Sequence, residues 1–362
     1  FPFKVLEISN EPLGVGSVAQ THLGNVQLAD GHEKEVVFRF IKPGVFHKAL
    51  EEREVILSAT RAIDENTSAS KLPFPKLEPL ADNVYFMIIE DMDLVKTMSN
   101  QMKAISVYSR SDVKVPEVWL SKEQKPLFMI QSKALGMKLS KYELPVRKKV
   151  INRIIQFWLE EAIYGSGYFH ADLHQGNFLV ELRKNFLGAE KEIKYLLDFG
   201  MFGKLNQNEK TLIIALGVAL KAKNIQAITK IIWDLANKSE TKISKEALFK
   251  AINEKYSYGS DEVSVEEMLK FFAKINLELK QNVLEFLRGS IALSTQLKEV
   301  DTRNTIISNA VKVALKHPLK SLKIFKLRMI TFKDLFSLSK KYLFPRANQD
   351  KSEVINQCLK YY

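Results

Sequence analysis

One stretch of eight residues, HADLHQGN from His170 to Asn177, limits the possible folds of this 362-residue chain more than any other. It places Asp172 two residues after a histidine and Asn177 five residues further on. Apolar residues at helical spacing between positions 150 and 162 predict that this loop follows a buried helix. In phosphoryl transfer, one aspartate orients or deprotonates the nucleophile, and an amide helps to hold magnesium on the phosphates. The spacing therefore predicts Asp172 as a catalytic residue and Asn177 as a magnesium ligand.

A second carboxylate follows at the end of an apolar segment. The sequence YLLDFG supplies Asp198, 26 residues after Asp172, as a second magnesium ligand, and Gly200 allows a sharp turn. Each motif alone is weak, but their order and their apolar flanks together favour a phosphotransfer site. An alternative is a zinc site with His170 and His174 as ligands. The neighbouring glycine and the oxygen-bearing side chains favour a loop and a hard cation instead.

A glycine-containing loop, GVGSVA, lies near the N-terminus. A dinucleotide-binding fingerprint would require a helix directly after it, whereas the residues that follow alternate like strands. Glycines between two strands let backbone amides approach phosphate groups. We therefore expect Gly14, Val15, Gly16 and Ser17 to contact a nucleotide, with a plain tight turn as the alternative.

Composition and periodicity indicate the fold class. Hydrophobic residues make up 46% and charged residues 27% of the chain, as in globular proteins of about two domains. The one cysteine, Cys358, excludes a disulfide framework and favours a reducing compartment. Residues 12–45 alternate like a hairpin with a turn at Ala29-Asp30-Gly31, whereas helical patterns dominate after about Leu144. We expect an α+β chain with a small sheet-rich lobe and a larger helical lobe.

The net charge of +12 is concentrated near the end of the chain, with nine Lys or Arg and one acid between Lys312 and Lys341. Its apolar residues recur at near-helical spacing: Leu319, Leu322, Phe325 and Met329. A basic amphipathic helix binds anionic lipid surfaces, but a solvated face of a core helix is an equal alternative. We expect no nucleic-acid partner, because no nucleic-acid module is recognisable. The longest apolar run, 212–220, is too short to span a bilayer and predicts a buried helix.

In order along the chain, these motifs resemble the UbiB/AarF-like atypical kinases, the ADCK group in animals. The resemblance rests on PLGVGSVAQTH from Pro12 to His22, on Lys42-Pro43-Gly44 after the third strand, and on HADLHQGN, and it runs from about residue 10 to residue 205. A family motif of acid-x-Asp followed by a helical Glu aligns with Asp91, Asp93 and Thr97. The resemblance places these three residues at the nucleotide site.

The resemblance implies a bilobal protein-kinase-like fold. Its lobes would be residues 1–135 with a helical insert and residues 136–300 with the catalytic and metal loops, followed by a basic helical region at 301–362. It implies ATP and Mg²⁺ as cofactors, ATPase rather than protein-kinase behaviour, and a role in ubiquinone or related isoprenoid-lipid metabolism. It also implies a cytoplasmic location with peripheral attachment to the inner face of a membrane, or the matrix side of a mitochondrion, and an anionic surface or lipid as partner.

Two positions depart from the family pattern. The family has a Lys four residues before the proline and a Glu on the helix, where this chain has Arg39 and Thr97. Strand alternation puts Arg39 on one face with Val37 and Ile41. An arginine fork is larger than an ammonium and needs two acceptors, and the motif supplies no acid to aim it. We therefore expect ATP binding to survive and turnover to fall. A KxGQ motif typical of the family is also absent from this sequence.

Three functional classes stay open on the sequence alone. The first, which we favour, is a UbiB-type ATPase or small-molecule kinase with Arg39 and the glycine loop on the phosphates. The second is a nucleotide-binding pseudokinase that acts as a scaffold at a membrane surface, as the pairing of Arg39 with Thr97 suggests. The third is an aminoglycoside- or choline-kinase-like phosphotransferase, whose catalytic loop is also similar. It would need an acidic pocket in the helical lobe for a cationic substrate.

Overall fold

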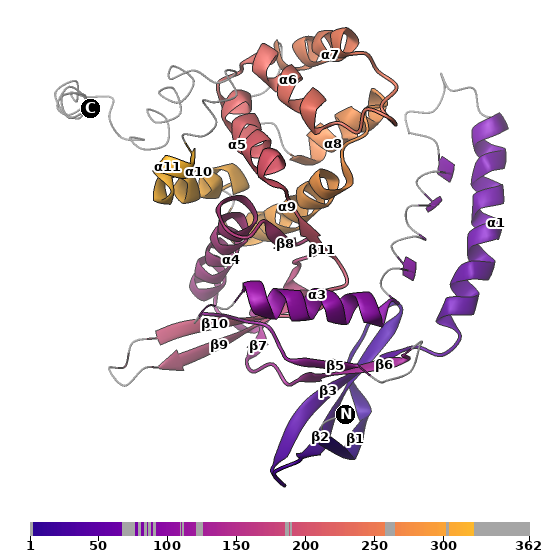
Figure 1. The fold of residues 1–362 in the computed structure, drawn as a ribbon, viewed down its shortest axis with the longest axis vertical. Coiled ribbons are helices and arrows are strands. Elements are labelled where there is room, and N and C mark those ends of the chain that lie inside the picture. The colour runs from indigo at the N-terminus through magenta and orange to yellow at the C-terminus, as the bar shows by residue number, and fades with distance from the viewer. Residues whose placement is uncertain are drawn as a thin grey trace. The chain divides into compact units, whose positions relative to one another are not determined.

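The computed structural model describes residues 3–66, 77–78, 81–82, 85, 88–89, 92–108, 110, 112–120, 126–184, 188, 190–257, 265–301 and 304–321 (Figure 1). Asp91 and the predicted basic amphipathic segment after Ser321 therefore lie outside the described residues. The chain forms two compact units. The first contains Phe1–Ile154, Tyr168–Lys204 and Glu285–Asp301, and the second contains Ile155–Gly167, Leu205–Leu284 and Thr302–Tyr362.

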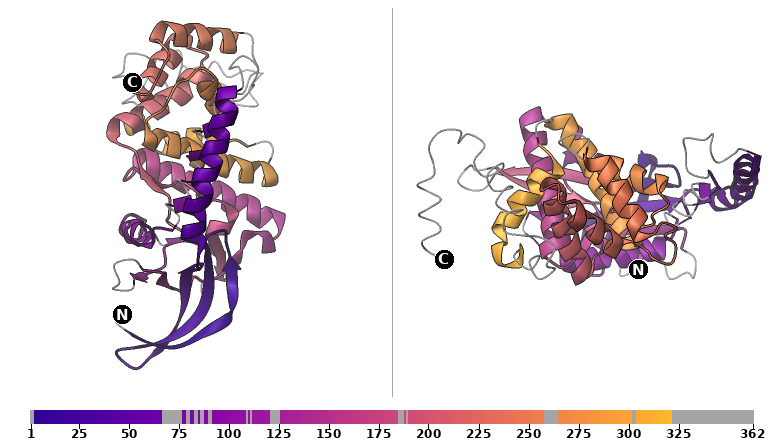
Figure 2. Two further views of the ribbon diagram at one scale, coloured as in Figure 1. Left: turned by 90° about the vertical axis from the view of Figure 1, so that its right-hand side faces the viewer. Right: turned by 90° about the horizontal axis from the view of Figure 1, so that it is seen from above.

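The first unit begins with an antiparallel sheet in the order β1-β2-β3-β6-β5. Its strands are β1 (Phe3–Val15), β2 (Ala19–Leu28), β3 (Glu33–Ile41), β5 (Val118–Leu120) and β6 (Phe128–Ser132). Figure 2 shows the first three strands twisted together as one long ribbon. Gly31 has φ +85°, which only glycine adopts readily, so the predicted hairpin turn is confirmed. Val26, Val36, Phe38 and Ile130 form the buried face.

The first unit also contains two helices, α1 (Val45–Asn66) and α3 (Leu94–Val107). Asp93 is the N-cap of α3, and its carboxylate accepts a hydrogen bond of 2.8 Å from the Lys96 backbone N–H. This cap satisfies a free donor of the first turn and fixes where the helix starts. α3 contacts β5 and β6, and its buried face includes Thr97, Gln101 and Ala104.

A second, smaller sheet in the order β4-β10-β9-β7 carries the loops of the candidate site. Its strands are β4 (Val113–Lys114), β7 (Met137–Lys138), β9 (Phe178–Lys184) and β10 (Glu190–Leu196). A separate pair consists of β8 (Tyr168–His170) and β11 (Phe202–Lys204). Short helical turns lie at η1 (Leu139–Lys141) and η3 (Gln175–Asn177), and the long helices are α4 (Leu144–Leu159) and α9 (Gln281–Val300).

An ion pair inside this smaller sheet carries our first prediction. Lys194 of β10 is 2% exposed and its Nζ lies 2.9 Å from Oδ2 of Asp112. Burial raises the pKa of Asp112, but the Lys194 ammonium more than offsets this and holds that pKa below its usual value. Asp112→Ala would leave a buried ammonium without its carboxylate. We expect it to lower the free energy of unfolding by about 3 kcal/mol, at the low end for buried pairs because the Asp112 side chain is 38% exposed.

Urea denaturation of the wild type and Asp112→Ala measures this loss. The control is Asp112→Leu combined with Lys194→Met, which removes both charges and should recover most of the stability. If the single and double variants were equally unstable, the stability lost in Asp112→Ala would not come from leaving the Lys194 ammonium without a counter-charge.

The second unit is helical in its described part. It contains η2 (Glu160–Tyr164), α5 (Gln207–Lys221), α6 (Ile225–Leu235), α7 (Lys245–Ser257), α8 (Val265–Lys274), α10 (Ile306–Lys316) and α11 (Pro318–Ser321). α5 starts with a capping box between Asn206 and Glu209, and it buries Leu212, Ala215 and Ala219. The predicted buried helix is therefore confirmed. No helix in the described ranges is both long and apolar enough to cross a bilayer.

Candidate functional site

The imidazole of His170 holds the loop that carries Asp172. His170 is fully buried, and its Nε2 lies 2.9 Å from the Leu197 carbonyl oxygen, to which it can only donate. Its Nδ1 accepts the backbone N–H of Asp172 at 3.2 Å. These two bonds define a neutral tautomer and tie the Asp172 loop to the segment just before Asp198. The predicted alternative of zinc ligation by His170 and His174 is wrong, because both nitrogens of His170 are engaged within the protein.

The buried imidazole predicts acid sensitivity. Burial lowers the pKa of His170, and the hydrogen bond to Leu197 and the charges of Asp198 and Asp172 offset this only in part. Because the folded pKa is depressed, the unfolded chain binds the proton more readily. Stability is then complete above the unfolded pKa of about 6.5 and decreases as the pH falls below it.

We expect the wild type to lose unfolding free energy through this residue between pH 7 and pH 5.5, by at most about 1 kcal/mol. His170→Gln keeps an N–H donor but cannot take up the proton, so it should show a correspondingly flatter pH dependence. Denaturant titrations of both proteins at the two pH values test this. Parallel curves would mean that His170 is not the group responsible.

The side chain of Asp172 is 49% exposed to solvent. Asn177 Nδ2 donates to the Asp172 carbonyl oxygen at 2.8 Å and lies 3.4 Å from its Oδ2. His174 Nε2 is 3.6 Å from the same carboxylate oxygen, while its Nδ1 accepts the Gly176 N–H at 3.0 Å. The carboxylate is thus oriented by two neighbours and remains accessible, as a residue that receives a proton from a substrate needs to be.

Asp198 lies on the second loop of the site, between β10 and β11. It follows β10 and has φ +55°, an unusual conformation for a residue with a side chain, of the kind often found at functional sites. Leu197 N donates to the Asn177 carbonyl oxygen at 2.8 Å, which joins the two loops directly. The structure therefore brings Asp172, Asn177 and Asp198 together within the first unit, although 26 residues separate the two aspartates.

Arg39 of β3 contacts Asp198, which corrects one expectation. The sequence suggested that no acid would aim the guanidinium, but Arg39 Nη1 lies 2.6 Å from Asp198 Oδ1. Arg39 is 8% exposed, whereas 37% of the Asp198 side chain is accessible to solvent. Burial raises the pKa of Asp198, but the charge and hydrogen bond of Arg39 more than offset this and hold it below its usual value. The carboxylate is therefore kept ionised. The proposed role of Arg39 on phosphate groups stays a prediction.

The glycine loop is shorter than the sequence suggested. Gly14 and Val15 pair with Thr21 and Gln20 as the end of β1, so the turn itself begins at Gly16. Gly16 N donates to the Ala19 carbonyl oxygen at 2.8 Å. Ser17 lies in the turn and is exposed. Contacts of Gly14, Val15, Gly16 and Ser17 with a nucleotide stay predictions.

Lys42 was missed by the sequence reasoning. It follows β3, and strand alternation predicts that its side chain points away from the face of Arg39. Its Nζ nevertheless lies 2.5 Å from the Gly16 carbonyl oxygen, so an ammonium sits directly at the glycine turn. If the glycine turn contacts phosphate groups, as the sequence predicts, the Lys42 ammonium adds a positive charge there.

α3 contributes the remaining contacts. Thr97 is fully buried, and among the described residues its Oγ1 has no hydrogen-bond partner. Asn100, almost one turn later, donates from Nδ2 to the Phe199 carbonyl oxygen at 2.9 Å and so supports the Asp198 loop. Asp93 caps this helix, and its predicted contact with the nucleotide is untested, as is that of Thr97. Asp91 lies outside the described residues.

Gln296 of α9 supports the Asp172 loop. It is 4% exposed, and its Nε2 donates to the Leu173 carbonyl oxygen at 2.7 Å. No sequence pattern signals Asn100 or Gln296, because each is an isolated amide on an amphipathic helix and its partner is a backbone carbonyl distant in the chain.

The donor set fits a hard divalent cation. Asp198 provides a carboxylate, and Asn177 uses its amide nitrogen for the loop, so its Oδ1 is the atom that would face an ion. Carboxylate and amide oxygens are the ligands that magnesium takes in phosphotransfer sites. Arg39 already contacts one oxygen of Asp198, so a cation would use the other oxygen or displace the guanidinium. Among the described residues, no group of three His, Cys, Asp or Glu is placed as a metal cluster.

An antiparallel sheet, a capped helix against it, and two loops that join Asp172, Asn177 and Asp198 define a protein-kinase-like α+β fold. Residues 3–232 match the family model described as "ABC1 atypical kinase-like domain". The chain belongs to this family.

Curated relatives are similar over part of the chain. A "Probable protein kinase UbiB" from Cellvibrio japonicus is 25% identical over 178 residues, which are 47% of this chain and 30% of that protein. "Protein ACTIVITY OF BC1 COMPLEX KINASE 8, chloroplastic" from Arabidopsis thaliana is 26% identical over 207 residues, 55% of this chain and 25% of that protein. The matched region thus spans less than a third of either relative.

A solved structure shares the fold. It is described as "The complex structure of Rv3197-erythromycin from Mycobacterium tuberculosis" and superposes with a TM-score of 0.50 at 14% identity, over 82% of this chain and 78% of that one. At this identity the likeness concerns the fold alone.

Proposed function

We propose that this protein binds magnesium ATP at the Asp172, Asn177 and Asp198 site and transfers or hydrolyses its terminal phosphoryl group. One observation carries the proposal: two loops joined by the Leu197–Asn177 backbone bond bring an accessible aspartate next to an amide and an ionised aspartate. That is the arrangement phosphoryl transfer requires.

In this proposal each side chain has one task. Asp172 orients the attacking hydroxyl or water and accepts its proton. Asn177 and Asp198 hold the magnesium ion, which would neutralise charge on the phosphates. Arg39 keeps Asp198 ionised and aimed, and Lys42 adds a positive charge at the glycine turn.

The wider role is proposed from the family resemblance and from charge. We propose that the protein takes part in the metabolism of ubiquinone or a related isoprenoid lipid at an anionic membrane surface, in the cytoplasm or the mitochondrial matrix. The nine Lys or Arg between Lys312 and Lys341 support attraction to such a surface.

The test uses the wild-type chain. A thermal-shift titration with ATP, with and without magnesium, measures binding, and ADP release with and without anionic vesicles measures turnover. We expect a stabilising shift that needs magnesium, and ADP release that anionic vesicles increase. The absence of any magnesium-dependent shift would overturn the proposal.

A second candidate, a nucleotide-binding pseudokinase, is favoured by the direct Arg39–Asp198 contact at 2.6 Å, because a guanidinium there competes with a metal ion. Arg39→Lys combined with Thr97→Glu restores the residue types usual in the family. If the missing pair limits an enzyme, the double variant should release ADP several-fold faster than the wild type. Arg39→Lys alone is the control, because it changes the cation without supplying the carboxylate that would pair with it, and it should release ADP no faster than the wild type. A wild type and a double variant that both bind magnesium ATP without turnover would favour the pseudokinase.

A further inference from the structure

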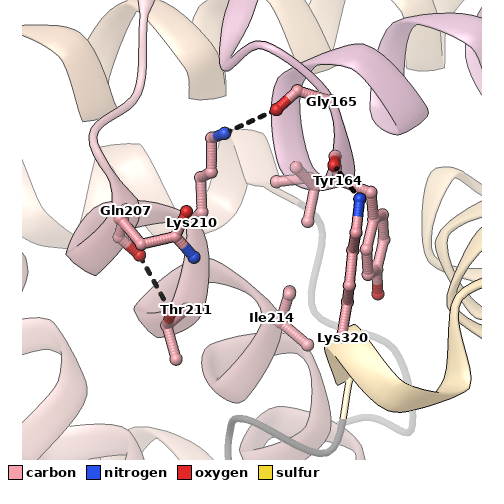
Figure 3. A pocket seen from close by; sticks show the side chains of 8 residues that line it. Tyr164, Gly165, Gln207, Lys210, Thr211, Ile214 and Lys320 are labelled. Atoms are coloured by element: carbon pink, nitrogen blue, oxygen red, sulfur yellow. Dashed lines mark hydrogen bonds between the residues drawn. The ribbon is translucent and has the colours of Figure 1, made fainter.

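The second unit contains a cavity of about 240 Å³ that the nucleotide site does not include. Its walls come from η2, from the first turns of α5 and from Lys320 of α11 (Figure 3). The residues that line it and matter here are Tyr164, Gln207, Lys210, Thr211, Ile214 and Lys320.

The ionisable charges in this lining are both positive. Lys210 is only 7% exposed, and its Nζ donates to the Gly165 carbonyl oxygen at 2.8 Å. Lys320 Nζ donates to the Tyr164 carbonyl oxygen at 2.8 Å. Figure 3 shows both ammonium groups directed at the same end of η2. An ammonium carries three donors, so Lys320 can keep its carbonyl and also contact a bound anion, while Lys210 adds positive charge at the same end of η2.

The backbone at this end is irregular. Glu160–Tyr164 forms a π-helical turn in which Gly165 N donates to the Glu160 carbonyl oxygen at 2.8 Å. Such turns are rare and frequently mark functional sites. Gly167 has φ +92°, and a Cβ there would lie 2.8 Å from Lys210 Cε. The glycine therefore gives the Lys210 side chain room to reach the carbonyl.

One wall of the cavity is held rigidly. The Tyr164 ring stacks on His317 at 4.8 Å between centroids and 19° between planes, and its hydroxyl lies 2.9 Å from Ser321 Oγ. Ile214 adds an apolar surface at the cavity. A fixed apolar wall beside two ammonium groups suits a ligand with an anionic head and a short carbon portion.

We propose that this cavity binds the phosphate group of a small organic phosphate or of a phospholipid headgroup. Its volume lies below the 300–1,000 Å³ typical of drug-sized ligands, which suits a headgroup-sized molecule and is too small for a nucleotide. Lysines bind phosphate as point charges, and the Gln207 side-chain amide offers further donors, whereas the Thr211 hydroxyl already donates to the Gln207 carbonyl oxygen at 2.9 Å. This site is independent of the proposed nucleotide function.

The test compares a soluble ligand with a membrane one. Calorimetric titration with glycerol 3-phosphate and with inorganic phosphate measures the soluble arm, and flotation with phosphatidylcholine vesicles, with and without phosphatidic acid, measures the lipid arm. Lys320→Gln removes one exposed cation, and Thr211→Asp adds a negative charge at the cavity. The control is Lys312→Gln, which removes an exposed lysine of α10 outside the cavity lining.

We expect Lys320→Gln to weaken binding about tenfold and Thr211→Asp to abolish binding of the soluble phosphates, while Lys312→Gln leaves soluble binding unchanged and weakens flotation less than Lys320→Gln, with all three variants folded by circular dichroism. Glycerol 3-phosphate binding that follows this pattern identifies a soluble phosphate as ligand. Flotation that follows it without soluble binding identifies a headgroup. The proposal is overturned if neither arm shows binding, or if Lys312→Gln weakens binding as much as Lys320→Gln.

Discussion

Asp198→Asn is expected to abolish magnesium-dependent ATP binding. The substitution keeps the size of the side chain but removes the negative charge that would neutralise the cation. Loss of a residue that merely supports a metal ligand typically costs 10–100-fold in affinity, so loss of the ligand charge itself should cost at least about 100-fold. The magnesium-dependent part of the thermal shift with ATP should therefore disappear.

Asp198→Asn also removes the partner of Arg39, so lost stability must be separated from lost binding. Asp301→Asn is the matched control, because Asp301 Oδ2 forms an ion pair of 3.0 Å with Lys148 and is 11% exposed, but it lies outside the catalytic and metal loops. It should lower the melting temperature without changing the magnesium-dependent shift. Equal shifts in the wild type and Asp198→Asn would rule out the proposed metal site.

Local patterns allowed much of the fold to be predicted. Alternation predicted β2 and β3, Gly31 predicted their turn, and the apolar run at 212–220 predicted a buried helix, because strand and helix periodicity place apolar residues on one face. The HADLHQGN spacing predicted that Asp172 and Asn177 share a loop. Such features depend on neighbours in the sequence, so the sequence records them directly.

Contacts between distant segments could not be predicted in the same way. Arg39 and Asp198 are 159 residues apart, and the family motif pointed only to position 97, where this chain has a threonine and no acid. The Asn100 bond to Phe199 is likewise set by how α3 lies against the loop, not by any local spacing. The lysine-lined cavity also depends on a π-helical turn, whose extra residue leaves no clear periodic signal.

Asp172→Asn is expected to separate binding from turnover. Asparagine can still accept the Asn177 hydrogen bond, which lies at 3.4 Å from the present carboxylate oxygen, so the loop should keep its shape. It cannot accept a proton from a hydroxyl or water. General-base catalysis contributes about 10²–10⁴-fold, and we expect ADP release to fall by that factor while magnesium ATP binding changes less than about twofold.

Single-turnover ADP release and the thermal shift with magnesium ATP measure the two quantities on the same preparation. His174→Gln is the control, because His174 lies 3.6 Å from the same carboxylate and is largely exposed, but it has no proposed role in proton transfer. It should reduce turnover far less than Asp172→Asn. If Asp172→Asn retained wild-type turnover while Asp198→Asn lost it, the metal site would stand and the nucleophile would have to be oriented by another group.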